Sequence, residues 1–216
     1  MNRILITGSS GTLGTRLWET LHKRGMDVVG VDCRPNRWIP ELDAKTIRVD
    51  LRNESEILDK LPTDFDMVIH LAANARVYSL VEQPRLALDN FITLFNTLDY
   101  LRINKISKVI FASSREVYGN GVRASFEEKN VTITGCESPY AASKLGGEAL
   151  VHSYQACYGI DAIIFRFSNI YGMYDDSDRV IPLFYRQCKA GEDITVYGDN
   201  KCLDFTYIDD SVAGIM

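Results

Sequence analysis

One stretch near the N-terminus limits the possible folds of this chain more than any other part of it. The short apolar run 4–7 leads into a glycine-rich segment, residues 8–14. A helical pattern follows, with leucines one turn apart at Leu13, Leu17 and Leu21, and a second apolar run then ends at Asp32. A strand, a glycine-rich turn, a helix and a strand in this order predict one βαβ unit of a parallel sheet.

The same unit predicts a binding function. Glycines permit a tight turn and a close approach of the backbone to an anion, and the free N–H groups at a helix N-terminus attract phosphate. An acid that ends the second strand can hydrogen-bond an adenosine ribose. We therefore expect a dinucleotide to bind at Gly8, Ser10, Gly11, Thr12, Leu13, Gly14 and Asp32. The charge of Asp32 would repel the 2′-phosphate of NADP, and although Arg34 and Arg37 could pair with that phosphate, the pattern favours NAD.

The alternation of strands and helices continues along the chain. Further apolar strand-like runs fall at 46–49, 67–71, 108–111 and 162–166. Helices are expected from a capping box at 53–56, over 79–104 with a break near Pro84, and around Tyr140. Nearly continuous apolar strands that alternate with helices indicate a parallel sheet covered on both faces. The fold class is therefore α/β, a doubly wound Rossmann domain over residues 1–172.

After residue 172 the pattern becomes less regular. We expect a polar loop over 173–179, a helix over 180–189, strands at 194–196 and 205–207, and a last helix capped by Asp209. Residues 173–216 are interpreted as a partial, smaller C-terminal lobe that covers a substrate.

Charge and cysteine content exclude several functions. The net charge is −5 and there is no Lys/Arg block, which argues against nucleic acid or an anionic membrane as the main partner. The five cysteines are scattered, as is typical of reduced thiols in the cytoplasm rather than of disulfides or zinc sites. The three histidines lie far apart, so no metal site is expected. No signal peptide or membrane span is recognised.

Tyr140 and Lys144 lie four residues apart in a predicted helix and therefore on one of its faces. An ammonium beside a phenol favours the phenolate and lowers its pKa from about 10 toward neutrality, where a tyrosine can exchange protons with a hydroxyl. This spacing also occurs by chance on ordinary helix faces. Its weight rises because the candidate residues Gly11, Asp32, Asp50, Ala72, Ser114 and Asn169 all follow predicted strands, at the sheet edge where ligands of such folds bind.

Several motifs, in this order, resemble one known family. They are TGSSGTLG at 7–14, DL at 50–51, HLAA at 70–73, Asn90, FASS at 111–114, VYG at 117–119, SPYAASK at 138–144, RFSNIYG at 166–172 and DFTYIDD at 204–210. The set is similar to that of the extended short-chain dehydrogenase/reductases that modify nucleotide sugars. The resemblance covers essentially the whole chain.

The resemblance implies a shared first step. Tyr140 would take the proton of a sugar hydroxyl while a hydride passes from the same carbon to NAD, and Lys144 would bind the nicotinamide ribose. Ser114 would bond the reacting oxygen, and Asn169 would contact the substrate diphosphate. Further cofactor contacts are implied at Asp50, Leu51, Leu71, Ala72, Ala73 and Asn90. The substrate would be a UDP- or dTDP-linked sugar, and a homodimer through the helix at 86–101 and the Tyr140 helix is implied.

Family branches differ in the fate of the 4-keto sugar. We expect a 4-epimerase acting on a UDP-sugar. Glu116 keeps open a 4,6-dehydratase or a decarboxylase, because those branches carry a glutamate there; it is alternatively a solvated loop carboxylate or a partner of Arg115. A dehydratase acting on thymidine-diphosphate glucose pairs an aspartate with that glutamate, where this chain has Arg115.

Two departures from the family are visible. Leu203 occupies a position where the family carries a nucleotide-binding arginine, for which Lys201 or Arg179 could substitute. Family members also run about half as long again, so the lobe is expected to be incomplete. A different class, a non-catalytic NAD-binding sensor or scaffold, stays open for this reason, although Ser114, Tyr140 and Lys144 together argue against it.

Overall fold

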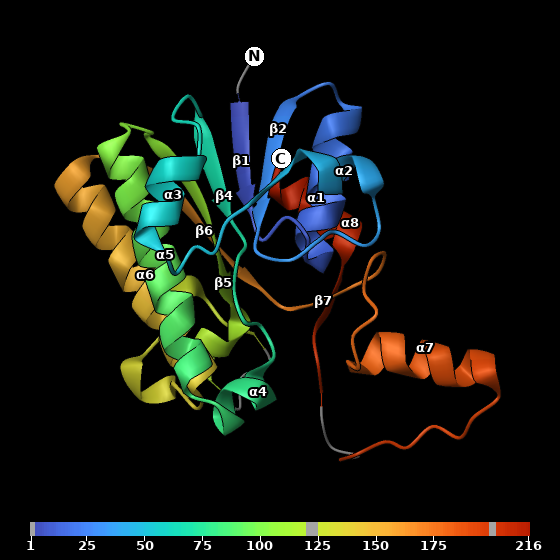
Figure 1. Ribbon diagram of the computed structural model, residues 1–216. Coiled ribbons are helices and arrows are strands. Elements are labelled where there is room, and N and C mark those ends of the chain that lie inside the picture. Colours follow the sequence, from blue (N-terminus) through green and yellow to red (C-terminus); the bar gives the residue numbers. More distant parts are fainter. Residues whose placement is uncertain (1–2, 120–124, 199–201) are drawn as a thin grey trace.

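A six-stranded parallel sheet forms the centre of the molecule in the computed structural model, which describes residues 3–119, 125–198 and 202–216 (Figure 1). Its strand order is β3-β2-β1-β4-β5-β6, the order of a Rossmann sheet. The strands are β1 (Arg3–Thr7), β2 (Asp27–Asp32), β3 (Thr46–Arg48), β4 (Met67–His70), β5 (Lys108–Ser114) and β6 (Asp161–Phe167). The predicted doubly wound α/β fold is confirmed.

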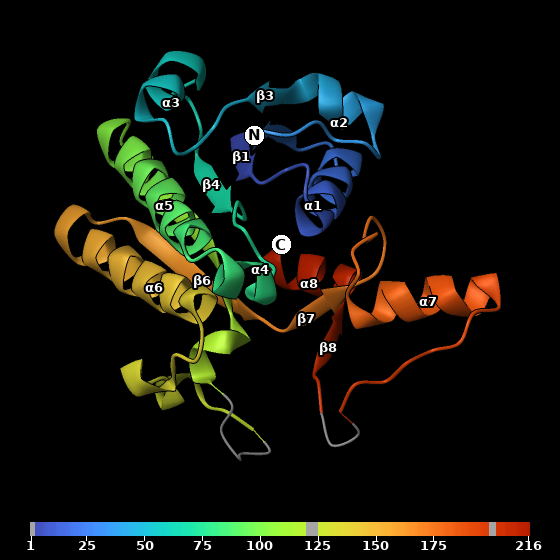
Figure 2. The same cartoon turned by 60° about the horizontal axis from the view of Figure 1, so that its bottom comes forward.

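Helices cover both faces of the sheet. One face carries α3 (Glu54–Lys60), α5 (Arg85–Ile103) and α6 (Pro139–Tyr158); the other carries α1 (Thr12–Lys23), α2 (Pro40–Lys45) and α8 (Ile208–Ile215) (Figure 2). Alternate residues of one strand therefore enter different cores: Leu5 packs with the first set of helices, and Ile4 and Ile6 pack with the second. Because both of their faces are buried, the central strands β1 and β4 are apolar over most of their length rather than alternating, whereas the edge strand β6 is partly exposed.

Helix ends follow local sequence signals. Asn53 accepts the Glu56 N–H and begins α3, as the predicted cap requires. The long helical region divides at Pro84 into α4 (Val77–Glu82) and α5. Ser138 accepts the Ala141 N–H at the start of α6, and this helix ends at Gly159, whose φ is +69°.

The C-terminal part differs in detail from the prediction. Residues 194–196 do not form a strand: within the described part of the chain no strand pairs with them, and Val196 and Tyr197 are largely exposed. The second sheet consists of β7 (Asn169–Tyr171) paired with β8 (Phe205–Tyr207), and α7 (Val180–Ala190) stands beside it (Figures 1 and 2). The last helix begins at Ile208 after Tyr207, not at Asp209, because the Asp209 carboxylate binds Arg16 instead of capping.

Helix α8 returns to the main body. Val212 and Ile215 are buried with Leu17 and Trp18 of α1, and Arg16 of α1 forms a two-point ion pair with Asp209. Among the described residues, no helix is both long and apolar enough to cross a membrane.

Candidate functional site

The glycine-rich turn after β1 is packed too closely for side chains. Gly8 has φ +71°, and a Cβ there would lie 2.7 Å from the Ala72 nitrogen. A Cβ on Gly14 would lie 2.2 Å from the Gly8 carbonyl oxygen. Gly11 precedes α1 without a side-chain cap, so the first N–H groups of α1 remain available to a ligand. These features fit a diphosphate group at the helix N-terminus.

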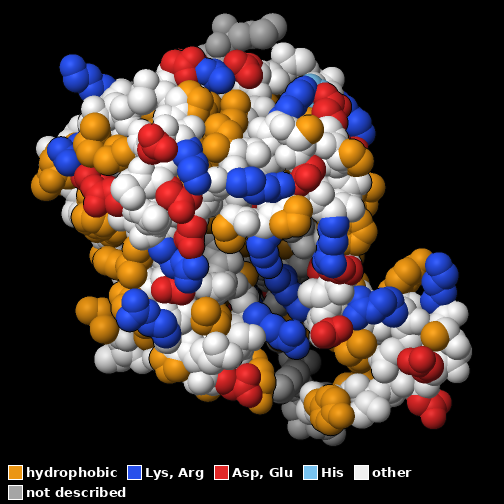
Figure 3. Space-filling view, in the orientation of Figure 1, with side chains coloured by type: hydrophobic (Ala, Val, Ile, Leu, Met, Phe, Trp, Pro, Cys, Tyr) orange, Lys and Arg blue, Asp and Glu red, His pale blue; other side chains and the backbone are white. Residues whose placement is uncertain are grey.

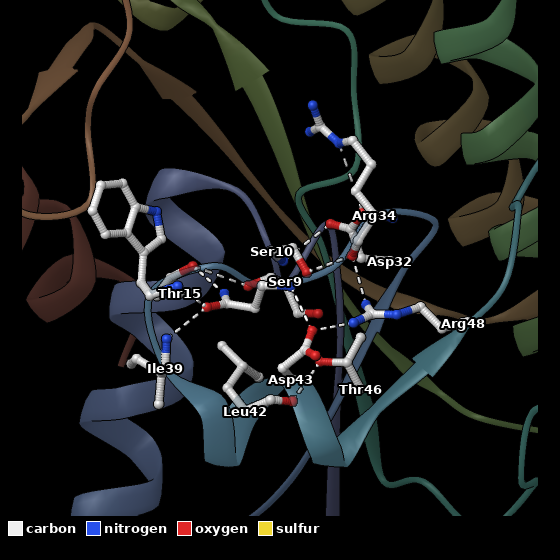
Figure 4. Close-up of polar contacts among 12 residues, drawn as sticks. Ser9, Ser10, Thr15, Asp32, Arg34, Ile39, Leu42, Asp43, Thr46 and Arg48 are labelled. Carbon is white, nitrogen blue, oxygen red and sulfur yellow. Dashed lines mark hydrogen bonds and ion pairs between the residues drawn. The ribbon is translucent and has the colours of Figure 1, made fainter.

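Asp32 lies at the end of β2, immediately beside the turn. Its carboxylate accepts the Ser10 N–H at 3.0 Å and the Arg34 N–H at 2.9 Å, and the residue is 7% exposed (Figure 4). The charge is thus fixed in place by backbone donors, with its remaining lone pairs free to accept ribose hydroxyls. Arg34 stays beside Asp32, with its Nε 4.0 Å from the carboxylate, whereas Arg37 pairs with Asp176.

A cavity of about 270 Å³ runs along the carboxyl edge of the sheet on both sides of β1. Its walls include nine of the predicted cofactor residues: Gly8, Gly11, Asp32, Asp50, Leu51, Leu71, Ala72, Ala73 and Asn90. Ser10 and Thr12 line a second cavity of about 370 Å³ beside it, bounded by Arg37, Trp38 and Tyr174. In the space-filling view, Lys and Arg side chains gather along the hollow between the two helical layers, as an anionic ligand would require (Figure 3).

Leu13 and Asn90 support this cavity. Leu13 lies in the first turn of α1 and packs against the core formed with β1 and α1. Asn90 of α5 accepts the Asn74 N–H at 2.6 Å and donates to the Asn74 carbonyl at 3.0 Å. It therefore holds the loop after β4 against α5, with a further contact to Ser143 of α6.

Ser114, Tyr140 and Lys144 come together at the end of β5. A hydrogen bond joins the Tyr140 and Ser114 hydroxyls, and Ser114 also accepts the Glu116 N–H at 3.2 Å. Lys144 donates from Nζ to the Ala112 carbonyl at 2.7 Å, and its Nζ lies 5.9 Å from the centre of the Tyr140 ring. Proline at the first helical position and the Ser138 cap fix where α6 starts, and hence where Tyr140 and Lys144 face.

The pKa of Tyr140 differs from the sequence expectation. Burial raises it above its ordinary value; the Ser114 hydrogen bond and the positive charge of Arg179 lower it, and Glu116 raises it further. Burial also lowers the pKa of Lys144 to about 8. The ammonium is bonded to the Ala112 carbonyl of β5. Lys144 is not among the groups that shift the Tyr140 pKa, so the expected lowering by Lys144 is absent from this state.

Glu116 follows Ser114 in a 3₁₀ turn, Arg115–Tyr118, and pairs with Arg115 at 2.9 Å. The proposed partnership of these two side chains is therefore present. The negative charge of Glu116 also raises the pKa of Tyr140.

The remaining predicted substrate residues lie on the smaller sheet and the loop before α7. Asn169 begins β7, and its amide donates to the Asp204 carbonyl at 2.9 Å. Leu203 is 41% exposed. Arg179 precedes α7, and its charge reaches Tyr140. Lys201 lies outside the described residues.

Two groups at the site were not anticipated. Arg52 binds both Asp50 and Asp89 on the cavity wall; its position directly after the Asp50–Leu51 pair was the available signal. His70 is fully buried at the end of β4, with Nδ1 3.0 Å from the Thr7 hydroxyl. Burial, together with the charge of Lys144, lowers the His70 pKa to about 3. Because the His70 imidazole is neutral, it adds no second positive charge near Lys144.

Comparison with known proteins identifies the family of the chain. The model of the NAD dependent epimerase/dehydratase family matches residues 4–216. UDP-glucuronate 4-epimerase 1 of Arabidopsis thaliana is 34% identical over 232 residues, which cover 99% of this chain and 54% of the plant protein. The chain thus spans about half the length of that relative.

Solved structures extend the likeness to the fold. UDP-glucose 4-epimerase of Thermus thermophilus, in complex with NAD, superposes with a TM-score of 0.87 at 28% identity, covering 99% of this chain and 73% of that one. An NAD dependent NDP-hexosamine 5,6-dehydratase involved in tunicamycin biosynthesis superposes with a TM-score of 0.87 at 31% identity, covering 100% and 71%.

Proposed function

Because the chain belongs to the NAD dependent epimerase/dehydratase family, we propose that it is a nucleotide-sugar epimerase, acting at C4 of a UDP-sugar through a 4-keto intermediate. The observation that carries this proposal is the joining of Ser114, Tyr140 and Lys144 at the carboxyl end of β5. This is the same edge of the sheet along which the cofactor cavity runs. Names of relatives, such as UDP-glucuronate 4-epimerase, support the choice of sugar nucleotide.

NAD is the cofactor, held by the residues already described along the sheet edge. When bound, NAD accepts a hydride from the sugar and returns it, so the overall reaction has no net oxidation. Gly8, Gly11, Thr12 and Gly14 receive the diphosphate at the start of α1. Asp32 accepts the adenosine ribose hydroxyls, and Asp50, Leu51, Leu71, Ala72 and Ala73 form the walls of the cavity.

Three side chains act on the sugar. Tyr140 in its phenolate form takes the proton from the C4 hydroxyl and gives it back when the hydride returns to the opposite face. Ser114 bonds the reacting oxygen and keeps it near the Tyr140 hydroxyl. Lys144 has one donor committed to Ala112, which leaves two for the nicotinamide ribose. The sugar gains and loses the same proton and hydride, so epimer and substrate have equal mass.

The part of the chain from 173 to 216 is a partial lobe that covers the substrate, and its last helix, α8, anchors it to α1 of the main body. Asn169, at the junction with this lobe, meets the substrate diphosphate, and Arg179 supplies a cation that faces the site. Asn169 begins β7, which pairs with β8, and Arg179 directly precedes α7, so both residues belong to segments outside the main sheet.

A second reaction is favoured by one observation: the negative charge of Glu116, two residues after Ser114, raises the pKa of Tyr140. A carboxylate beside the 4-keto sugar could remove the C5 proton and help expel water from C6, as a 4,6-dehydratase does. In a decarboxylase the C6 carboxylate would leave instead. The Arg115–Glu116 ion pair argues against both reactions, because one oxygen of the Glu116 carboxylate already binds Arg115.

The assembly and location of the protein complete the proposal. A homodimer would form through α5 and α6, where Leu88, Phe95 and Tyr158 are exposed apolar side chains. Its cysteines are all free, which suits the cytoplasm.

Incubation of the NAD-loaded chain with UDP- and dTDP-sugars, a hexuronate included, tests the function. A changed sugar of unchanged mass supports the epimerase, whereas loss of water or of carbon dioxide overturns it in favour of the dehydratase or decarboxylase. Glu116→Gln separates these further: an epimerase keeps turnover within a few-fold, and a dehydratase loses it. NAD binding without conversion of any sugar would indicate a non-catalytic sensor or scaffold.

A further inference from the structure

A buried ion pair lies behind the proposed site and touches none of the residues assigned to substrate or cofactor. Glu148 of α6 and Arg166 of β6 meet at two points, Nε to Oε1 at 2.9 Å and Nη2 to Oε2 at 2.7 Å. Their side chains are 4% and 19% exposed. Removing charges from water is costly, so a pair in this position must be held by further hydrogen bonds.

Glu148 fixes the helix to the strand that ends at the site. Tyr140, Lys144 and Glu148 are spaced by four residues and therefore share one face of α6. They bond in turn to the last three residues of β5: Tyr140 to the Ser114 hydroxyl, Lys144 to the Ala112 carbonyl, and Glu148 to the Ser113 hydroxyl.

Gly147 allows this close contact between helix and strand. A Cβ at Gly147 would lie 2.8 Å from the Phe111 ring and 2.9 Å from Leu94. The helix therefore approaches β5 at a distance that lets the short Ser113 hydroxyl reach Glu148. Any shift of α6 along β5 would break all three bonds together.

Arg166 extends the same cluster to the segment that carries Glu116. Its Nη1 donates to the Tyr118 hydroxyl at 3.0 Å and to the Glu128 carbonyl at 2.8 Å. The guanidinium also lies 5.0 Å from the centre of the Tyr118 ring, and this ring stacks on Phe126. Glu148 and Arg166 thus hold both the end of β5 and the 3₁₀ turn after it.

We propose that Glu148 and Arg166 are positioning residues for the reaction, which hold Ser114 and Glu116 in register with Tyr140 without contacting substrate. The proposal rests on the function proposed above. A guanidinium is required because it makes two parallel hydrogen bonds to the Glu148 carboxylate and still has an N–H for the Tyr118 hydroxyl. A lysine ammonium cannot make this planar two-point contact.

Arg166→Lys tests this role, with Arg16→Lys as the matched control. Arg16 also forms a two-point pair with a carboxylate, Asp209, and its side chain is likewise 19% exposed. Both variants should lose stability. Only Arg166→Lys should lower kcat, by about tenfold to a hundredfold, as expected for a small misplacement of reacting groups, while KM and the Kd for NAD change little.

A second readout is independent of turnover. The titration of Tyr140 is isolated by the absorbance difference between each protein and its Tyr140→Phe counterpart. Loss of the Ser114 bond should raise the Tyr140 pKa in Arg166→Lys and not in Arg16→Lys. The two charges that act on the phenol, Arg179 and Glu116, are unchanged in both variants, and so is Lys144 on the same helix face. If the parent chain has no turnover, the proposed epimerase function is wrong, but the Tyr140 titration can still be measured and still tests the positioning role.

Tyr118→Phe provides a milder variant if Arg166→Lys fails to fold, since it removes one acceptor of Arg166 and keeps the ring. It should change kcat and the Tyr140 titration in the same direction by a smaller factor. The proposal is overturned if neither variant moves these two measurements, or if Arg16→Lys moves them equally, because the ion pair would then act on stability alone.

Discussion

Lys144 and Tyr140 share a helix face, but the Lys144 ammonium donates to the backbone of β5 and the Tyr140 hydroxyl is bonded to Ser114. Nζ donates to the Ala112 carbonyl at 2.7 Å and lies 5.9 Å from the centre of the phenol ring. The hydroxyl is bonded to Ser114, and burial keeps its pKa raised. Two separate consequences follow, one for the phenol and one for the ammonium.

Tyr140→Phe should remove turnover and leave cofactor binding intact. The change deletes only the hydroxyl that exchanges the proton, and general acid–base groups contribute about 10²–10⁴ in rate. We expect kcat to fall by about that factor. The Kd for NAD, measured by calorimetry, should stay within about threefold of the parent value. Full turnover in this variant would exclude Tyr140 as the acid–base group.

Lys144→Met should abolish turnover and stabilise the fold. Burial lowers the Lys144 pKa from 10.5 to about 8, so the unfolded chain holds this proton more tightly than the folded chain. The resulting cost is fully present below pH 8 and is relieved as pH rises toward 10.5. It amounts to at most about 3 kcal/mol, offset in part by the lost bond to Ala112.

Urea unfolding of the Lys144→Met chain at pH 7 is therefore expected to give a free energy about 1 kcal/mol above that of the parent. The difference should shrink at pH 10. A less stable variant at pH 7 would mean that the bond to Ala112 outweighs the cost of the buried charge.

Gly8→Ala compared with Gly25→Ala separates close packing from backbone strain. The two glycines have nearly the same conformation, φ +71° and +75°, but a Cβ meets Ala72 at 2.7 Å in the first and nothing within 4 Å in the second. Gly25→Ala should cost about 1 kcal/mol from the left-handed φ alone. Gly8→Ala should cost at least twice as much in thermal or urea unfolding and should weaken NAD binding. Equal losses would contradict the close approach of the turn to β4.

The pattern of apolar runs was sufficient to predict the sheet because parallel strands buried on both faces are apolar throughout. Leu5 enters one core and Ile4 and Ile6 the other, and no polar alternation confuses the assignment. The same reasoning failed at residues 194–196, which are β-branched and apolar in part but have no strand to pair with. Apolar, β-branched composition shows that a segment can adopt an extended conformation. Whether it forms a strand depends on a partner strand from elsewhere in the chain.

At the site, too, local sequence patterns predicted some features and could not predict others. Spacing placed Tyr140 and Lys144 on one helix face, and strand ends placed Asp32, Asp50 and Ala72 on one cavity wall. The direction of the Lys144 ammonium depends on where the Ala112 carbonyl lies across the helix–strand contact, and no local pattern encodes it. The pairing of Glu148 with Arg166 likewise needs the register of β5 with β6, in which Ser113 is opposite Arg166.

His70→Asn should reduce the acid sensitivity of the fold. Burial lowers the His70 pKa from 6.5 to about 3, so below pH 6.5 the unfolded chain binds a proton that the folded chain does not. Stability from this source falls as pH drops from 6.5 toward 3, by about 1.4 kcal/mol per unit. Asparagine keeps an acceptor for Thr7 and has no such proton.

The slope of the unfolding free energy between pH 6 and pH 4 is accordingly expected to be smaller in His70→Asn than in the parent. His152→Asn is the control, because His152 is exposed. An unchanged slope in His70→Asn would show that other groups dominate acid unfolding.

Asp32→Asn should shift the choice between NAD and NADP. The carboxylate is held by the Ser10 and Arg34 N–H groups, and an asparagine oxygen can accept one of these bonds without a negative charge. The repulsion toward a ribose 2′-phosphate then disappears, while Arg34 stays close by. We expect the ratio of the two Kd values to move toward NADP by about tenfold or more, which corresponds to about 1.4 kcal/mol. Fluorescence titration with both dinucleotides measures this ratio, and Asp27→Asn, at the opposite end of β2, is the control. An unchanged ratio in Asp32→Asn would mean that Asp32 lies away from the adenosine ribose.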